Sequence, residues 1–143
     1  MRFSDEDRPV PPGPGGKPLV VAIDDDPAVL SALSRLLGGE PYDFIPTTDP
    51  EEALDLVRTR SVSVVLADYR MPVLSGSGLL QVVKATSPST YRLMLTAYPH
   101  STWVMRAQEM GAIEKVVEKP WDNDELRGLI RNQLFGDDSS GDL

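Results

Sequence analysis

The sequence predicts an α/β fold, a doubly wound five-stranded parallel sheet with helices on both faces. Short apolar runs alternate with segments of helical periodicity between residues 18 and 135. The connections are short, and alternation of this kind gives a parallel sheet. A chain of 143 residues, 41% hydrophobic and 25% charged, can bury one core of ordinary size. One domain is therefore expected over residues 18–135.

The first strand and helix are expected within residues 19–39. The apolar run 19–23 reads as a buried strand, and Asp26 followed by Pro27 is typical of a helix start. Glycines 38 and 39 then end the helix. One helical face is apolar, formed by Leu30, Leu33, Leu36 and Leu37.

The second strand is expected at residues 42–46, where Pro46 confines it to an edge of the sheet. Asp49 and Pro50 form the next helix start, with a capping acid and a proline at the first helical position. Two glutamates follow and face the positive end of the helix dipole. The apolar side of this helix consists of Ala53, Leu54 and Val57.

Three further strand and helix units complete the domain. Residues 62–67 are apolar apart from Ser63, which is typical of a strand covered on both faces. The remaining elements are expected as a helix at 77–86, a strand at 91–95, a helix at 99–110, a strand at 115–118 and a helix from about Asp122. The last helix directs four residues inward, namely Leu126, Leu129, Ile130 and Leu134.

The two ends of the chain differ in composition from the middle. Residues 1–17 are rich in proline and glycine and are expected to form a disordered arm, and residues 136–143 an acidic flexible tail. No apolar run approaches the roughly 18 residues of a membrane span, and the N-terminus lacks the apolar core of a signal peptide. We therefore expect a cytoplasmic protein that does not contact the membrane.

Charge and cysteine content exclude several classes of function. The chain has no cysteine, which excludes disulfides, thiolate zinc sites and cysteine nucleophiles. Its formal net charge of -8 disfavours direct binding of nucleic acid, which needs a basic surface. The acidity instead favours solubility and a concentrated acidic site for a cation.

Carboxylates cluster where two predicted strands end. Asp24 and Asp25 follow the first strand and Asp68 follows the third, and ligands of open α/β sheets bind at the carboxyl ends of strands. Mg2+ prefers such oxygen ligands. The alternative is that these acids only cap the next helix. We assign that capping to Asp26, whereas the third acid, Asp68, favours a metal site for the others.

The same edge of the sheet collects groups that can hold a phosphoryl group. Asp68 could be a pure metal ligand or a nucleophile that forms an aspartyl-phosphate. Lys119 offers an ammonium, Thr96 a hydroxyl and Ala97 a backbone N–H, and phosphoryl transfer depends on such charges and donors. Each residue alone is common on a surface or in a turn. Their joint placement at successive strand ends indicates a phosphoryl-transfer site.

The site residues lie in four short motifs, namely Ile23-Asp24-Asp25-Asp26-Pro27, Leu66-Ala67-Asp68-Tyr69-Arg70-Met71-Pro72 with Gly76, Leu95-Thr96-Ala97, and Lys119-Pro120. Taken in order, these motifs resemble the receiver domain of two-component response regulators over residues 18–135. The resemblance implies a flavodoxin-like fold with strand order 2-1-3-4-5.

The resemblance also implies the roles of the site residues. Asp68 would be the phosphoacceptor, and Asp25, Asp68 and the backbone carbonyl of Arg70 would bind Mg2+, with Asp24 helping through water. Thr96, Lys119 and the Ala97 N–H would hold the phosphoryl group, and a cis peptide is expected at Lys119-Pro120.

The resemblance implies partners as well. The donor would be a histidine kinase or a histidine phosphotransfer protein, and an output domain or effector protein would receive the signal. The chain would not be an enzyme beyond the Mg2+-dependent phosphorylation and dephosphorylation of its own Asp68.

Several positions depart from the usual receiver pattern. Val116 stands three residues before Lys119, where receivers usually carry an aromatic ring that switches position. Arg70 and Tyr98 are bulky and flank the expected water path to the phosphoryl group.

The two tryptophans have no assigned role in the site. Trp103 lies on the fourth helix and is expected to be packed rather than to bind a partner, whereas Trp121 could cover the last helix or face a partner.

Two alternatives remain open from the sequence. A haloacid-dehalogenase-like phosphatase also uses an aspartyl nucleophile and Mg2+, but it expects an acid where Arg70 stands. A phosphorylation-independent interaction module would keep the fold without the switch, and Val116 is the feature that supports it.

Overall fold

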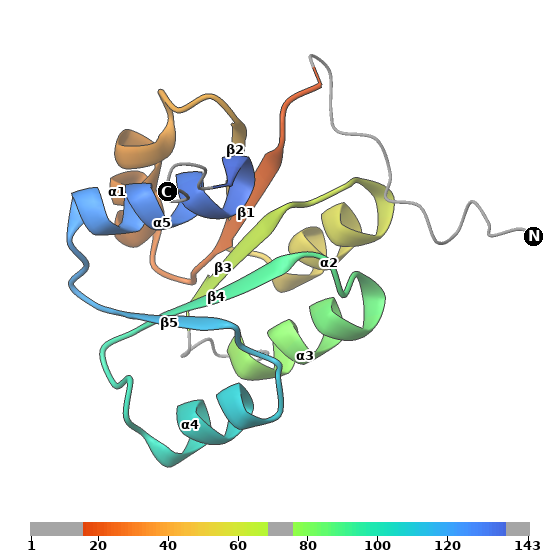
Figure 1. Ribbon diagram of the computed structural model, residues 1–143, viewed down its shortest axis with the longest axis vertical. Helices are drawn as coiled ribbons and strands as arrows, with labels where there is room; N and C mark the ends of the chain where they lie inside the picture. The colour runs from red at the N-terminus through yellow and green to blue at the C-terminus, as the bar shows by residue number, and fades with distance from the viewer. Residues whose placement is uncertain (1–15, 69–75, 137–143) are drawn as a thin grey trace, which may run out of the picture.

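The computed structural model describes residues 16–68 and 76–136, and within them five parallel strands alternate with five helices (Figure 1). The sheet order is β2-β1-β3-β4-β5, and each neighbouring pair is parallel. The predicted fold and strand order are thereby confirmed. The strands are β1 (Leu19–Ile23), β2 (Asp43–Thr47), β3 (Val64–Asp68), β4 (Tyr91–Thr96) and β5 (Lys115–Glu118).

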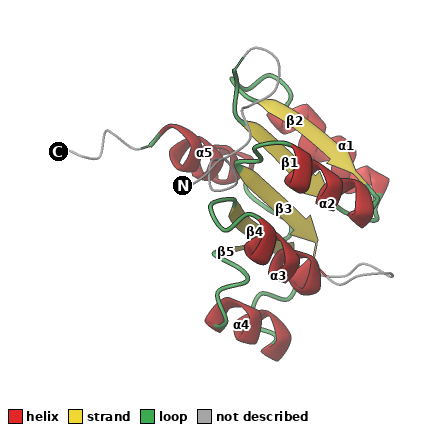
Figure 2. Ribbon diagram, turned by 90° about the vertical axis from the view of Figure 1, so that its right-hand side faces the viewer, coloured by secondary structure: helices red, strands yellow, loops and turns green. Residues whose placement is uncertain are grey.

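Helices cover both faces of this sheet, as the view across it shows (Figure 2). Side chains of α1 and α5 pack in one buried cluster, and those of α2, α3 and α4 pack in the other. The helices are α1 (Pro27–Leu37), α2 (Pro50–Thr59), α3 (Gly76–Thr86), α4 (Thr102–Glu109) and α5 (Asn123–Phe135). Within the described ranges, no helix combines the length and apolar character that crossing a membrane requires.

The two buried clusters follow from the alternation of side chains along the strands. In β1, Val20 and Ala22 join the cluster under α1 and α5, whereas Leu19, Val21 and Ile23 join the opposite cluster. All five are at most 1% exposed. Successive side chains of a strand point to opposite faces, so a strand buried on both sides must be apolar throughout.

The edges of the sheet are polar or interrupted. β2 lies at one edge, as Pro46 predicted, and β5 at the other. The first and last residues of β5, Lys115 and Glu118, are both exposed. Neither edge therefore offers a long apolar strand to another chain.

Several predicted boundaries shift by one to three residues. The second strand runs from Asp43 to Thr47, and the third begins at Val64 although Val62 is also buried. The fourth helix begins at Thr102 rather than Pro99, because the Ser101 side chain caps it and accepts a hydrogen bond from the Val104 N–H.

The prediction that Trp103 packs inside is wrong, because its side chain is 65% exposed. The buried residues of α4 are Val104 and Ala107, three positions apart on one stripe. Position 103 lies about 100° from Val104 around the helix and about 40° from Ala107, so it stands at the margin of this stripe, with its side chain exposed. Trp121 is partly buried against the cluster under α1 and α5, and its indole N–H donates to Asn123 Oδ1 at 2.9 Å.

Helix α5 is joined to the turn between α1 and β2 by a forked ion pair. Arg131 donates from Nε to Glu40 Oε1 at 2.5 Å and from its terminal nitrogen to Oε2 at 2.9 Å. The Glu40 side chain is only 8% exposed, and two parallel bonds give the pair a defined geometry. Tyr42 follows in the same turn and is 3% exposed.

The hydroxyl of Tyr42 is buried and has no hydrogen-bond partner in the described part of the chain. A buried polar group without a partner costs about 1–3 kcal/mol. Replacing Tyr42 with Phe should therefore raise the free energy of unfolding by about 1 kcal/mol. Urea denaturation at pH 7 measures this change, and Tyr91→Phe, at a less buried ring, is the matched control.

Alkaline pH provides a second readout for the same variant. Burial raises the pKa of Tyr42 from 10.0 to about 12, with the nearby Glu40 charge adding to the rise. The unfolded chain then loses this proton before the folded chain does, so stability is full below pH 10 and falls as pH rises toward 12. That decline should be shallower in Tyr42→Phe; equal slopes for both proteins would contradict the burial of the hydroxyl.

Candidate functional site

The candidate site lies at the carboxyl ends of four strands. Asp68 and Thr96 are the last residues of β3 and β4, and Asp24 and Lys119 directly follow β1 and β5. Because the strands are parallel, these ends meet at one edge of the sheet. They border a hollow of about 360 Å3, which is lined by Asp24, Asp25, Asp26, Asp68, Thr96, Ala97, Tyr98 and Lys119.

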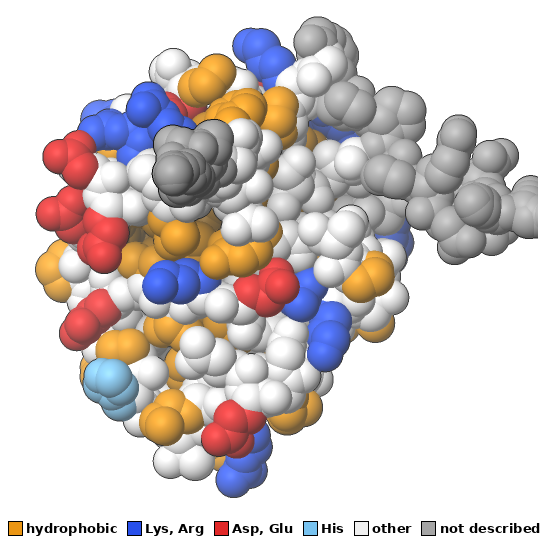
Figure 3. Space-filling view, viewed as in Figure 1, with side chains coloured by type: hydrophobic (Ala, Val, Ile, Leu, Met, Phe, Trp, Pro, Cys, Tyr) orange, Lys and Arg blue, Asp and Glu red, His pale blue; other side chains and the backbone are white. Residues whose placement is uncertain are grey.

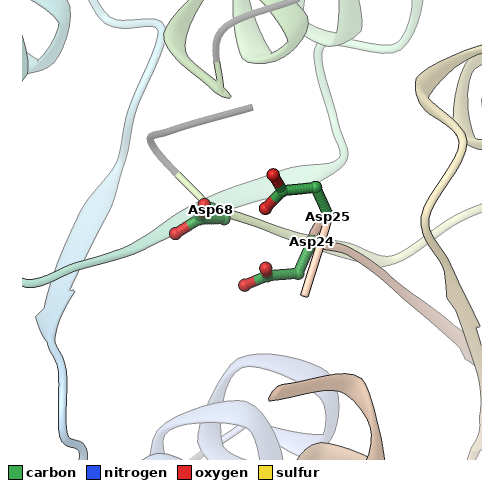
Figure 4. Close-up of side chains that lie close together, drawn as sticks. All are labelled: Asp24, Asp25 and Asp68. Carbon is green, nitrogen blue, oxygen red and sulfur yellow. The ribbon is translucent and has the colours of Figure 1, made fainter. Parts of the chain in front are cut away.

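Three carboxylates form the acidic part of the hollow. Asp24 and Asp25 come from the end of β1 and Asp68 from the end of β3, with all three side by side (Figure 4). Each offers an oxygen, and these oxygens lie within 4.8 Å of one another. Asp24 and Asp68 are buried, whereas Asp25 is exposed. A compact, all-oxygen, anionic group of this kind suits Mg2+, so the residues fit the predicted cofactor.

Asp24 makes contacts inside the protein with both of its oxygens. Oδ1 accepts a hydrogen bond from the Asp26 N–H at 2.9 Å, and Oδ2 accepts one from Lys119 Nζ at 3.1 Å. Burial raises the pKa of Asp24, although these two hydrogen bonds partly oppose the rise. The side chain therefore helps to position Lys119, and it is also one of the three carboxylates that could hold a metal ion.

Asp26 is separate from this group, as predicted. It is the N-cap of α1, and its carboxylate accepts a hydrogen bond from the Ala28 N–H at 2.9 Å. One of three consecutive acids thus caps the helix, while the other two belong to the carboxylate cluster with Asp68.

Lys119 is the positive charge of the site. Its Nζ lies 2.6 Å from Asp68 Oδ1 and 3.1 Å from Asp24 Oδ2. Burial alone would lower the pKa of Lys119, but the bonds to the two carboxylates outweigh burial and raise the pKa. The ammonium is therefore charged at neutral pH. The peptide bond to Pro120 is cis, as the sequence predicted.

Thr96 connects the site to the loop before α4. The residue is 1% exposed, and its Oγ1 accepts a hydrogen bond from the Tyr98 N–H at 2.9 Å. Its backbone carbonyl accepts from the Lys119 N–H at 2.8 Å, which fixes Thr96 and Lys119 side by side. The Tyr98 side chain is 53% exposed at the rim.

Two contacts at the site were not predicted. The bond between Thr96 and Tyr98 has a local signal, because threonine often accepts from an N–H two residues on. The bond between Lys119 and Asp24 spans most of the chain and has no local signal. Arg70 lies outside the described residues, so its carbonyl ligand and its shielding role stay predictions.

Comparison with known proteins is consistent with this geometry. The family model described as response regulator receiver domain matches residues 20–131. The transcriptional regulatory protein ZraR of Escherichia coli O157:H7 is 31% identical over 115 residues, which cover 80% of this chain and 26% of that protein. Sporulation initiation phosphotransferase F of Bacillus subtilis is 25% identical over 115 residues, covering 80% of this chain and 92% of that protein.

A solved structure agrees as well. The signal receiver domain of an HD domain-containing protein from Pseudomonas fluorescens superposes with a TM-score of 0.77 at 31% identity, covering 83% of this chain and 88% of that one.

Removing Asp25 should weaken Mg2+ binding by about tenfold or more, because loss of even an outer-sphere group commonly costs about 10–100-fold in metal affinity. Asp26→Ala should keep the Mg2+ affinity and instead lose about 1 kcal/mol of helix capping. Calorimetric Mg2+ titration of Asp25→Asn and Asp26→Ala, with urea unfolding of both, separates the two effects. If Asp26→Ala proves more damaging to Mg2+ binding, the assignment of the acids is wrong.

Proposed function

The chain belongs to the response regulator receiver domain family, and we propose that it accepts a phosphoryl group on Asp68 in a Mg2+-dependent reaction. One observation carries the proposal. Lys119 Nζ lies 2.6 Å from Asp68 Oδ1, and the oxygens of Asp24 and Asp25 lie within 4.8 Å of those of Asp68. A single carboxylate thus has a cation on one side and a fitting metal site beside it.

The transfer follows from these positions. A carboxylate oxygen of Asp68 attacks phosphorus, the O–P bond forms, and the N–P bond of a phosphohistidine breaks. The bonding electron pair leaves with the imidazole of the donor, which is a histidine kinase or a histidine phosphotransfer protein. Lys119, the Thr96 hydroxyl and the Ala97 N–H bind the phosphoryl oxygens.

The metal site has a limited part in this proposal. Asp25, Asp68 and the backbone carbonyl of Arg70 hold the ion, and Asp24 acts through water. When bound, Mg2+ stabilises the charge that develops on the phosphoryl oxygens. The chain therefore acts as a phosphoacceptor, with its chemistry restricted to phosphorylation and dephosphorylation of its own Asp68.

The response of the protein begins at Thr96. If its hydroxyl turns toward a phosphoryl oxygen, the Tyr98 N–H loses the acceptor that it now has at 2.9 Å. The loop of residues 97–101 can then rearrange, because the bond that ties the partly buried Tyr98 N–H to the end of β4 is lost. Val116 is partly buried against the core and has no ring to follow Thr96, so the change runs through the backbone.

The surface that carries the response consists of α4, β5 and α5. A groove of about 610 Å3 runs between β5 and α5, where hydrophobic side chains gather (Figure 3). On α4 and at its C-cap, three large apolar side chains are about half exposed or more, namely Trp103, Met105 and Met110. An output domain or effector protein is the partner that we propose for this surface.

The length of the related proteins is relevant to where an output domain could lie. The chain spans about a quarter of the length of the first curated relatives that it matches, such as ZraR at 26%. We propose that an output domain can be attached in such longer proteins. We propose that the donor, a histidine kinase or its phosphotransfer protein, meets this chain in the cytoplasm.

A phosphorylation-independent interaction module is the second candidate, and Val116 favours it. The aspartyl-nucleophile phosphatase is the weaker alternative, because the receiver family matches residues 20–131. Whether Asp68 is phosphorylated, and what changes afterwards, distinguishes the receiver, the interaction module and the phosphatase.

Incubation with phosphoramidate and Mg2+ should add one phosphoryl group, because Asp68 lies 2.6 Å from the Lys119 ammonium and also offers an oxygen to the candidate metal site. Intact mass spectrometry measures the gain. Asp68→Asn should show none, whereas Asp55→Asn, at an exposed acid on α2, should label like the wild type. A phosphoryl mass that persists in Asp68→Asn would sink the assignment, and an unlabelled wild type would favour the interaction module.

Phosphate should leave Asp68 slowly. Hydrolysis needs a water in line with the breaking bond, and Tyr98 lines the hollow while Arg70 is two residues beyond Asp68. Each tenfold slowing needs only about 1.4 kcal/mol of barrier. The phosphorylated form of the double variant Arg70→Ala with Tyr98→Ala should therefore decay faster than that of the wild type. An unchanged lifetime rules out shielding by these side chains.

A further inference from the structure

Arg92 is a buried charged residue that the proposed chemistry does not use. It is the second residue of β4, the strand that ends at Thr96, so it lies at the opposite end of that strand from the site. Its exposed fraction is 4%. A buried guanidinium is retained only where it is fully hydrogen-bonded or paired, so its partners indicate what it holds.

The partners of Arg92 are backbone carbonyls on either side of it. On the connection between α4 and β5, Nε donates to the Ala112 carbonyl and a terminal nitrogen to the Gly111 carbonyl, both at 3.1 Å. The other terminal nitrogen donates to the carbonyls of Thr90 at 2.9 Å and Pro88 at 3.1 Å. The guanidinium thereby joins the end of α4 to the turn before β4.

Glu114 strengthens the same connection. Its carboxylate accepts from the Arg92 backbone N–H at 3.1 Å and lies 3.7 Å from the guanidinium. Its own N–H donates to the Arg92 carbonyl at 2.8 Å. Arg92 therefore makes hydrogen bonds to three residues of the connection between α4 and β5, namely Gly111, Ala112 and Glu114. These bonds restrict the backbone motion of that connection.

A second cation holds the last turn of α4 from the other side. Lys84 on α3 donates from Nζ to the carbonyl of Met110, the C-cap of α4, at 3.0 Å. Gly111 follows with φ +82°, and a Cβ there would lie 2.7 Å from Lys84 Nζ. The glycine thus allows both the left-handed turn and the close approach, and two cations face the negative end of the helix dipole.

The other end of α4 is held by its own cap and by one buried side chain. Ser101 accepts a hydrogen bond from the Val104 N–H at 3.2 Å and Val104 is 0% exposed, whereas Trp103 is 65% exposed. In Figure 1, α4 lies below the sheet, at the far side of β5 from α5. Its N-terminal end is joined to the site through residues 97–101 and the bond from the Tyr98 N–H to Thr96.

We propose that Arg92 and Lys84 form the fixed pivot of α4, so that a rearrangement at Thr96 moves the N-terminal part of the helix while Met110 to Ala112 stay in place. Both are positioning residues, since neither lines the site hollow. The inference rests on the proposed function, because the site must first respond to a phosphoryl group. It goes further in assigning which part of the output surface moves.

The test uses the full chain with Mg2+ and beryllium fluoride, an analogue of the phosphoryl group. In the wild type, amide chemical shifts should change at residues 97–106 and stay within error at 110–113. In Arg92→Met, and to a smaller extent in Lys84→Met, the analogue should also shift residues 110–113. Amide hydrogen exchange there should be about tenfold faster in Arg92→Met, because hydrogen bonds to a charged donor are lost.

The controls separate the pivot from general destabilisation and from the proposed function. Arg58→Met removes an exposed arginine of α2 and should behave as the wild type does. Lys84 is exposed, so Lys84→Met tests the pivot even where Arg92→Met fails to fold. A shift pattern confined to 97–106 in folded variants overturns the pivot alone. A wild type that binds the analogue but does not change at 97–106 overturns the proposed function and the pivot with it.

Discussion

The structure depends on one ammonium held between two carboxylates. Asp24 and Asp68 are buried acids at neighbouring strand ends, and like charges so placed repel each other and lose their hydration. Lys119 offsets both costs, because its Nζ lies 3.1 Å from one acid and 2.6 Å from the other. The lysine can reach them only if β5 ends at the same edge as β1 and β3. The ion pairs of the site therefore depend on the order and direction of the strands.

The two ends of β4 contact opposite ends of α4. At its carboxyl end Thr96 touches the loop that precedes α4, and near its amino end Arg92 holds the turn that follows α4. In the response that we propose, the short helix lies between a responsive end and a fixed end of the same strand. Because Val116 is aliphatic, the proposed path from the site to the surface of α4 runs through the backbone of the loop.

Much of this arrangement could be predicted from local patterns, and the exceptions have a common cause. The run ending at Asp68 is recognisable as a strand because it is almost entirely apolar, and Asp24, Asp68 and Thr96 are recognisable because each stands at the end of such a run. The exposure of Trp103 depends on which stripe of α4 faces the sheet. Arg92 binds carbonyls, which every residue has, so no side-chain pattern reveals its partners. The exposure of Trp103 and the partners of Arg92 both depend on how segments far apart in the sequence pack together.

The guarded edges of the sheet have a consequence for how such a domain is reused. Pro46 lacks an N–H on one edge strand, and charged residues open and close the short strand on the other. A foreign strand therefore finds no continuous ladder to extend. A unit of this kind can be joined to unrelated neighbours through gene fusion without its sheet merging with theirs. The varied lengths of its relatives, from one it nearly spans to those it covers by a quarter, fit such modular recombination.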